Sequence, residues 1–174
     1  MTYVYHRVPS DLKGHILRPL NDWKEIEPEL YASKVAKYVG REHVMEQRID
    51  SLGCIWNDVL FLQPIHPAKI NAALTSLGHP LKGREYYQIP LEILESSHTT
   101  LWLWEHNGAA NKAPNCFLPC TDEELAKHQE LREVTLRYYE EQYSLGKSPL
   151  LYYMVPHVLY RGVLDTRQLE IITI

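Results

Sequence analysis

Apolar residues recur at helical spacing over the first long segment of the chain. Between residues 28 and 49 they follow one another at steps of four, three, seven and four, from Tyr31 to Ile49. Such spacing places side chains on one face of a helix, so the pattern predicts a single helix over 28–49. Glu42 occupies the one slot in this stripe at which an apolar residue is missing. We therefore expect a carboxylate on the core-facing side of the helix.

Two further helices are predicted from apolar periodicity together with end signals. The segment 68–77 has an apolar face, and Gly78 follows it where a helix C-cap belongs. The segment 121–145 opens with Thr121 and Glu124, the spacing of a capping box, and it stops at Gly146.

Short β-rich runs bounded by Pro, Gly and polar residues predict the strands. The predicted strands are 2–8, 58–62, 85–89, 99–104, 150–155, 158–164 and 169–174, and 107–115 is a predicted polar loop. Regular alternation of strands and helices is absent, which disfavours a doubly wound parallel sheet. The order predicts an α+β fold: one domain over residues 1–174, with a mixed or antiparallel sheet packed by about three helices.

Composition narrows the class of protein. The 174 residues carry a net charge of −4, so no general nucleic-acid-binding surface is expected. No apolar run approaches the ~18 residues of a membrane span, no signal-like apolar segment opens the chain, and three Cys do not suit a secreted disulfide scaffold. We therefore expect a cytoplasmic protein without a membrane partner. The chain has twelve Tyr and four Trp but two Phe. This excess fits either a core whose edges are exposed to water or a pocket in which aromatic rings stack on a planar ligand.

The strongest local candidate for chemistry is His6, at the end of the first predicted strand. Pro9 and Gly14 follow it in a predicted turn, which would place the imidazole at the edge of a cleft. There it could bond a ligand hydroxyl or carry a proton near neutral pH. The alternative is an ordinary strand histidine whose ring nitrogens bond the backbone.

Tyr5-His6, then Leu12 and the run Gly14-His15-Ile16-Leu17, resemble the opening of ADP-ribosyltransferase-like proteins, a superfamily that includes the tRNA 2′-phosphotransferases. The strand, helix and strand over 58–94 are in a compatible order. The resemblance implies that His6 contacts the ribose of NAD, that a Tyr or Trp stacks on nicotinamide, and that ADP-ribose passes to a macromolecular or small acceptor. The chain is also similar to small bacterial proteins that share YHRVP, KYxGRE and WNDV segments, a similarity that indicates no activity.

Several other polar residues are candidates for the same site. Glu42 is the candidate catalytic carboxylate beside His6, although it could instead pair with Arg41 or Arg48. The Trp56–Asn57–Asp58 run either forms a turn or presents polar atoms beside a stacking ring. The candidate cofactor-binding residues are Tyr5, His6, Trp56, Asn57, Asp58 and His66, and Tyr153 and His157 are analogous candidates near the last strands.

Three other functions stay open at this stage. Cys116 and Cys120 have an admissible spacing for half of a zinc site, but no second pair accompanies them, so no metal is predicted. A non-enzymatic module could bind a small ligand or a protein through a Tyr- and Trp-rich surface. A small hydrolase or lyase could use His6 as its general base. The convergence of His6, Glu42 and Asn57 or Asp58 in one pocket would favour an enzyme.

Overall fold

The computed structural model describes residues 1–104 and 116–174, and every strand pair that these residues form is antiparallel. The larger sheet has the order β5 (Leu60–Leu62), β9 (His157–Tyr160), β7 (Thr99–Trp102) and β8 (Phe117–Pro119). The second sheet has the order β1 (Tyr3–Arg7), β6 (Glu85–Pro90) and β11 (Glu170–Thr173). Two short pairs join β2 (Ile16–Leu17) to β10 (Leu164–Asp165) and β3 (Arg48–Ile49) to β4 (Cys54–Ile55).

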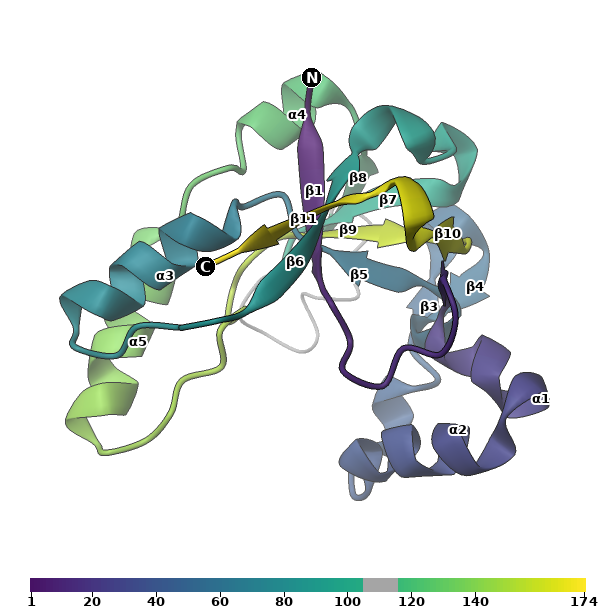
Figure 1. Ribbon diagram of the computed structural model, residues 1–174, viewed down its shortest axis with the longest axis horizontal. Coiled ribbons are helices and arrows are strands. Elements are labelled where there is room, and N and C mark those ends of the chain that lie inside the picture. The colour runs from purple at the N-terminus through teal and green to yellow at the C-terminus, as the bar shows by residue number, and fades with distance from the viewer. Residues whose placement is uncertain (105–115) are drawn as a thin grey trace.

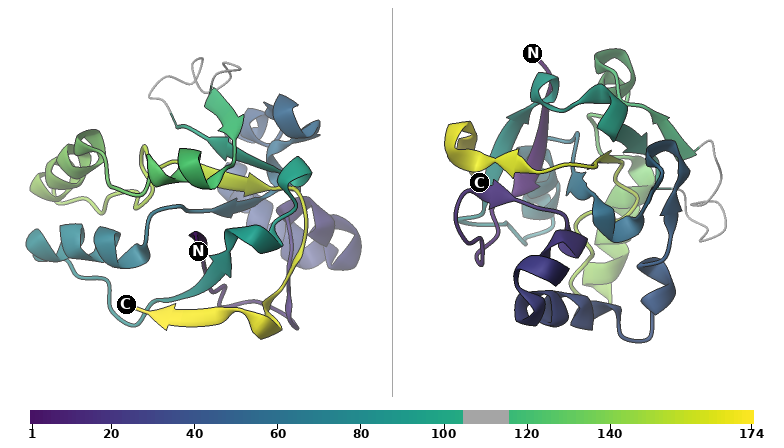
Figure 2. Two further views of the ribbon diagram at one scale, coloured as in Figure 1. Left: turned by 90° about the horizontal axis from the view of Figure 1, so that it is seen from above. Right: turned by 90° about the vertical axis from the view of Figure 1, so that its right-hand side faces the viewer.

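A single pair of residues connects the two larger sheets. The amide N of Tyr5 lies 2.8 Å from the carbonyl O of Gln63, and the amide N of Gln63 lies 2.9 Å from the carbonyl O of Tyr5. This bridge sets β1 beside the end of β5, and the second sheet lies over one face of the larger sheet with a shared apolar core between them (Figures 1 and 2).

The central strands β7 and β9 are buried along their whole length, so they face protein on both sides of the sheet. Leu101 and Val158 lie opposite each other and belong to a core cluster that also includes residues of β1 and β6. Trp102 and Leu159 point to the other face, where a second cluster gathers. Alternation along each strand thus supplies two cores from one short sheet.

Four of the five helices that the described residues form lie at two opposite ends of the packed sheets. The five are α1 (Trp23–Ile26), α2 (Pro28–Val35), α3 (Pro67–Ser76), α4 (Asp122–Ala126) and α5 (Glu133–Ser144). Helices α3 and α5 lie together at one end, and α1 and α2 lie at the other (Figures 1 and 2). Ile70 and Leu74 of α3 pack with Tyr139 of α5 in a third apolar cluster. The α+β fold class is confirmed.

The residues that were predicted to end one helix and to begin another do so in the structure. Helix α3 begins with Pro67 at its first position, and Gly78 follows it with φ of 84°. The Thr121 side chain accepts a hydrogen bond from the amide of Glu124, as a capping residue should. The predicted loop 107–115 lies outside the described residues. In the described part of the chain, no helix has both the length and the apolar character that crossing a membrane requires.

The single helix predicted over 28–49 is wrong beyond Val35. The chain continues as 3₁₀ turns and then as β3, and Gly40 has φ of 79°, which an α-helix does not accommodate. Successive turns of three residues also repeat apolar side chains at steps of three and four, which explains the misleading periodicity. Glu42 therefore does not lie on a buried helical stripe.

The predicted helix over 121–145 and the predicted strand over 150–155 are also corrected. The helix is broken into α4 and α5, and residues 150–155 form turns with Met154 at φ of 58°. Side chains of α5 bond the carbonyls of this segment in place of a strand partner. The Thr135 hydroxyl donates to the carbonyl of Tyr153 at 3.0 Å, and the Tyr139 hydroxyl donates to that of Leu151.

Replacing Leu74 by Ala should lower the free energy of unfolding by about 2–5 kcal/mol, because its side chain is fully buried between α3 and α5. Urea denaturation measures this change. The matched control is Leu145→Ala, whose side chain is 57% exposed and which should change stability by less than about 0.5 kcal/mol. Equal effects of the two substitutions would contradict the packing described for α3.

Candidate functional site

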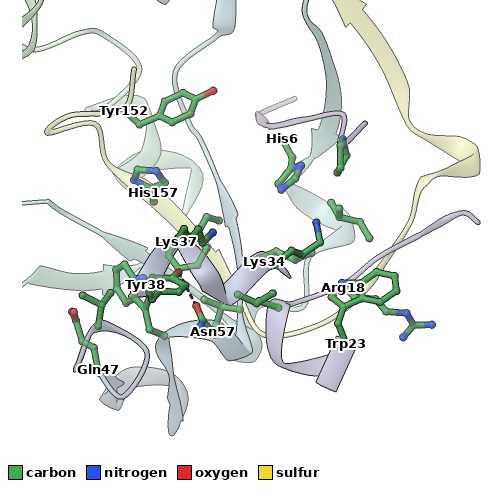
Figure 3. Close-up of a pocket in the computed structure, with 18 of the residues that line it drawn as sticks. His6, Arg18, Trp23, Lys34, Lys37, Tyr38, Gln47, Asn57, Tyr152 and His157 are labelled. Carbon is green, nitrogen blue, oxygen red and sulfur yellow. Dashed lines mark hydrogen bonds between the residues drawn. The ribbon is translucent and has the colours of Figure 1, made fainter. Parts of the chain in front are cut away.

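A cavity of about 800 Å³ opens between the larger sheet and the segment that contains α1 and α2. This volume lies in the range of small-molecule sites. The residues that surround it come from widely separated parts of the chain, as Figure 3 shows for ten of them. We call it the cavity from here on.

The sheet side of the cavity is set by strand register. Trp102 of β7 lies directly opposite His157 of β9, and Phe61 of β5 lies opposite Leu159. Opposed residues share a face, so Phe61, Trp102 and His157 all point to the same side of the sheet. All three line the cavity.

Aromatic rings form a packed wall on this side. The ring of Trp56 lies 4.9 Å from that of Phe61 and 4.8 Å from that of Trp102, centroid to centroid. The His157 ring lies 5.6 Å from Trp102 and 6.2 Å from Phe61. Rings this close touch one another, so they present one surface rather than an open cage for a cation.

His157 is buried and neutral. Its Nδ1 lies 2.8 Å from the carbonyl O of Val155, and because a carbonyl only accepts, Nδ1 must carry the proton. Burial lowers the pKa of His157 to about 4, and the bond to Val155 opposes this only in part. The other ring nitrogen, Nε2, is therefore an unprotonated hydrogen-bond acceptor at neutral pH.

His6 repeats this arrangement from a different strand. Its Nδ1 lies 2.6 Å from the carbonyl O of Arg7, and burial lowers its pKa to about 4. Part of the ring surface stays open to the cavity, but protein atoms surround the rest, which accounts for the desolvation. The expectation that His6 could carry a proton near neutral pH is therefore corrected, because its ring is neutral at that pH. Figure 3 shows the two rings on either side of the cavity.

Cations gather at the more exposed part of the lining. Arg18, Lys34 and Lys37 line the cavity together with one carboxylate among the described residues, Asp11. Lys34 Nζ lies 2.6 Å from a carboxylate oxygen of Asp11, and this bond lowers the pKa of Asp11. Partial desolvation and the charges of Lys34 and Arg41 lower the pKa of Lys37, so its ammonium lies in a positive surrounding.

Hydrogen-bond donors without a partner lie deeper. Asn57 is 2% exposed; its Oδ1 accepts a bond of 3.0 Å from the Tyr38 hydroxyl, and its Nδ2 has no partner. Gln47 Nε2 and Trp102 Nε1 are likewise buried and unbonded, and all three residues line the cavity. A buried donor without an acceptor costs about 1–3 kcal/mol, so acceptors on a ligand would relieve this cost.

The structure brings together four of the candidates from the sequence. His6, Trp56, Asn57 and His157 line the cavity. Asp58 follows Asn57 but forms the turn, because its carboxylate accepts from the amide of Ile55 at 3.0 Å and from Asn21 Nδ2 at 2.7 Å. Both interpretations of the run therefore hold, each for a different residue.

The remaining candidates lie elsewhere. Tyr5 is buried edge-on against His66, and His66 caps α3 by accepting from the amide of Ala68. Glu42 is exposed and accepts from the amide of Gly40 at 2.9 Å, a bond that lowers the pKa of Glu42. These three residues are not part of the cavity lining.

The described residues contain no group of three His, Cys, Asp or Glu side chains that could hold a metal ion. Cys54 and Cys116 share an apolar cluster, while Cys120 packs against a different one. Burial raises the pKa of the Cys120 thiol to about 12, so it is not a ready thiolate ligand. His106, which the zinc alternative would use, lies outside the described residues.

Sequence reasoning missed most of the deep lining. Gln47 and Trp102 carried no motif, and His157 was only a minor candidate. Lys37, in the more exposed part, belongs to the KYxGRE segment, which indicated no activity. Each reaches the cavity through a long-range pairing or an irregular turn. The excess of Trp and Tyr was the one available signal, and it pointed to a planar ligand without locating the residues.

No protein-family model, no curated protein and no solved structure matches this chain.

Stability should fall as pH drops from 6.5 toward 4, because His157 is neutral in the folded state while its unfolded pKa is about 6.5. Between these pH values the unfolded chain binds one proton more than the folded chain. The stabilisation that comes from the neutral His157 is therefore complete above pH 6.5 and is lost as the pH falls toward 4. The slope should be about 1.4 kcal/mol per pH unit for this residue. Urea denaturation from pH 5 to 7.5 measures it.

His157→Gln should remove the contribution of His157 and leave that of His6, whose pKa is also lowered to about 4, whereas the exposed His98→Gln should leave the pH dependence unchanged. The same slope in the His157 variant and in the unmodified protein would contradict a buried neutral imidazole.

Proposed function

We propose that this protein binds NAD or a related nucleotide in the cavity, with His6 beside the ribose. The observation that carries the proposal is that one cavity combines His6, a wall of aromatic rings and the cations Arg18, Lys34 and Lys37. A nucleotide offers the matching groups: a flat ring, hydroxyls and phosphates. The resemblance of the Tyr5-His6 opening to ADP-ribosyltransferase-like proteins supports NAD among nucleotides.

Each part of such a ligand has a chemically suited partner. The neutral His6 ring can accept a hydrogen bond from a ribose hydroxyl through Nε2, because its Nδ1 is held by Arg7. Lys37 and Arg18 can meet phosphate oxygens with charge-assisted hydrogen bonds. Trp56 offers a ring surface against which a planar group can pack.

ADP-ribosyl transfer is the activity that we propose for such binding. In that reaction the bond from nicotinamide to ribose C1′ breaks, the acceptor nucleophile bonds C1′, and the nucleophile loses its proton. Asp11 is the carboxylate that lines the cavity, whereas Glu42 lies outside it. Any carboxylate that assists the acceptor from within the described lining would therefore be Asp11.

A second function is favoured by the pairing of Asp11. Its carboxylate is already held by Lys34 at 2.6 Å, so the described lining offers no unpaired carboxylate for catalysis. A protein that only binds the nucleotide needs no such group. The two functions differ in whether NAD is consumed, so nicotinamide release across a panel of nucleic-acid and protein acceptors separates them.

NAD at about 100 times its dissociation constant should stabilise the protein by about 2.7 kcal/mol, and His6→Ala should remove most of this effect. Thermal denaturation with and without millimolar NAD measures it. His98→Ala is the matched control, because His98 is exposed and does not line the cavity. An equal shift in the His6 variant would place the ligand elsewhere, and no shift in the unmodified protein would reject NAD binding.

Lys37→Met should weaken binding of a phosphate-bearing nucleotide by about ten- to a hundredfold and reduce the salt dependence of its affinity, because one charge-assisted bond of about 1.5–3 kcal/mol is lost. Fluorescence titration at low and moderate salt reports both changes. Lys24→Met is a close control: Lys24 lies over the Tyr31 ring much as Lys37 lies over Tyr38, but outside the cavity lining. Similar losses in both variants would argue against a phosphate contact.

A further inference from the structure

The deep wall of the cavity is chemically distinct from its cationic part. Lys34 and Lys37 keep access to solvent, whereas Asn57 and Trp102 are at most 5% exposed. The deep residues carry no charge at neutral pH. Two parts of one ligand with different chemistry would therefore be separated along the cavity.

We infer that this deep wall is a subsite for a planar ring that carries a carbonyl oxygen. The inference rests on the proposed nucleotide binding and adds which part of the ligand the deep wall selects. We call the residues that form it the carbonyl subsite: Gln47, Trp56, Asn57, Trp102 and His157.

The three buried, unbonded polar atoms of the carbonyl subsite are all hydrogen-bond donors. The indole Nε1 of Trp102 can only donate, and it is buried without a partner. Asn57 turns its Oδ1 to the Tyr38 hydroxyl, which leaves Nδ2 as a second donor. Gln47 Nε2 is the third. The three donors belong to residues of separate segments that line one cavity, and each lacks an acceptor such as a carbonyl oxygen.

The neighbouring groups define the rest of the ring. His157 lies opposite Trp102 in the sheet and presents Nε2 as an acceptor, so a ring N–H or amide NH₂ beside the carbonyl would have a partner. The Trp56 ring supplies an apolar surface for a flat group. A phosphate would fit poorly here, because no cation accompanies these donors and desolvation of its charge would be costly.

Two sources could supply this chemistry within a nucleotide. One is the carboxamide of nicotinamide, and the other is an oxo-substituted base such as hypoxanthine or guanine. Both place a carbonyl oxygen on a planar ring with an N–H group nearby. Adenine differs, since an amino donor stands where the oxo purines have an acceptor.

Calorimetric titration with two matched ligand pairs tests the carbonyl subsite. The first pair is NAD and the same dinucleotide with an unsubstituted pyridine ring, and the second is inosine and adenosine monophosphate. In at least one pair the carbonyl-bearing ligand should bind about tenfold more tightly, the worth of one good hydrogen bond to a buried donor. The pair that discriminates identifies the source of the ring.

Trp102→Phe should remove this preference while the carbonyl-free ligand keeps its affinity, because the ring stays and only the N–H is lost. Trp104→Phe is the matched control: Trp104 stacks on Trp102 and lines the cavity, but its indole nitrogen is not among the buried unbonded donors. Asn57→Asp provides a second variant. It keeps the acceptor for Tyr38 and exchanges a donor for an acceptor, so preference should shift toward adenosine monophosphate.

The possible failures are distinguishable. If the unmodified protein binds nucleotides but neither pair discriminates, the carbonyl subsite is rejected and the proposed function stands. If Trp102→Phe weakens both members of a pair equally, the ring matters and the N–H does not, which also rejects it. If no nucleotide binds, NAD included, the proposed function and this inference fall together.

Discussion

The two hydrogen bonds between Tyr5 and Gln63 are the constraint on which the cavity depends. They join β1 to the end of β5 through one residue pair, and beyond that pair the strands separate. His6 follows Tyr5, and Phe61 precedes Gln63 by two positions, and both side chains line the cavity. The bridge therefore holds one residue of each sheet at the same cavity.

Polar groups without partners lie in this space at a free-energy cost, which the apolar clusters around it offset. Three buried donors cost about 1–3 kcal/mol each, an amount comparable with the net stability of a small domain. The two histidines avoid a similar cost by different means: each donates through Nδ1 to a nearby backbone carbonyl and stays uncharged. The backbone thus fixes the orientation of both rings.

Local signals predicted those parts of the fold that local interactions determine. Helix α3 followed from its apolar face, with Pro67 at its start and Gly78 after its end. The helix over 28–49 failed because Gly40 adopts a positive φ and the chain turns. Nothing in the sequence around 127–132 marks the break between α4 and α5, since neither Gly nor Pro occurs there. The strand over 150–155 failed because hydroxyls of α5 satisfy its carbonyls, a tertiary interaction that no local pattern encodes.

The candidate site also consists of residues that local signals predicted and residues that they did not. His6 and the Trp56–Asn57 pair could be found because each stands beside a turn next to a strand. Trp102 and His157 are 55 positions apart, and they meet only through the register of β7 and β9. A one-residue slip would turn both side chains to the other face of the sheet. The proximity of Trp102 and His157 could not be found from the sequence because long-range strand pairing defines it.

Charged and uncharged side chains lie in different parts of the cavity, so the groups that would attract an anionic ligand differ from those that would select it. The chain as a whole carries −4, so an anion is repelled at long range, and only the local group of Arg18, Lys34 and Lys37 favours its entry. These side chains are flexible and reach solvent, so they can hold phosphates of many ligands without distinguishing them. Discrimination requires rigid groups shielded from water, where a missing hydrogen bond cannot be replaced. The deep residues meet this condition because strand pairing and the turn at Asp58 fix their backbones. Affinity would thus arise at the cationic part of the cavity and specificity at its deep wall.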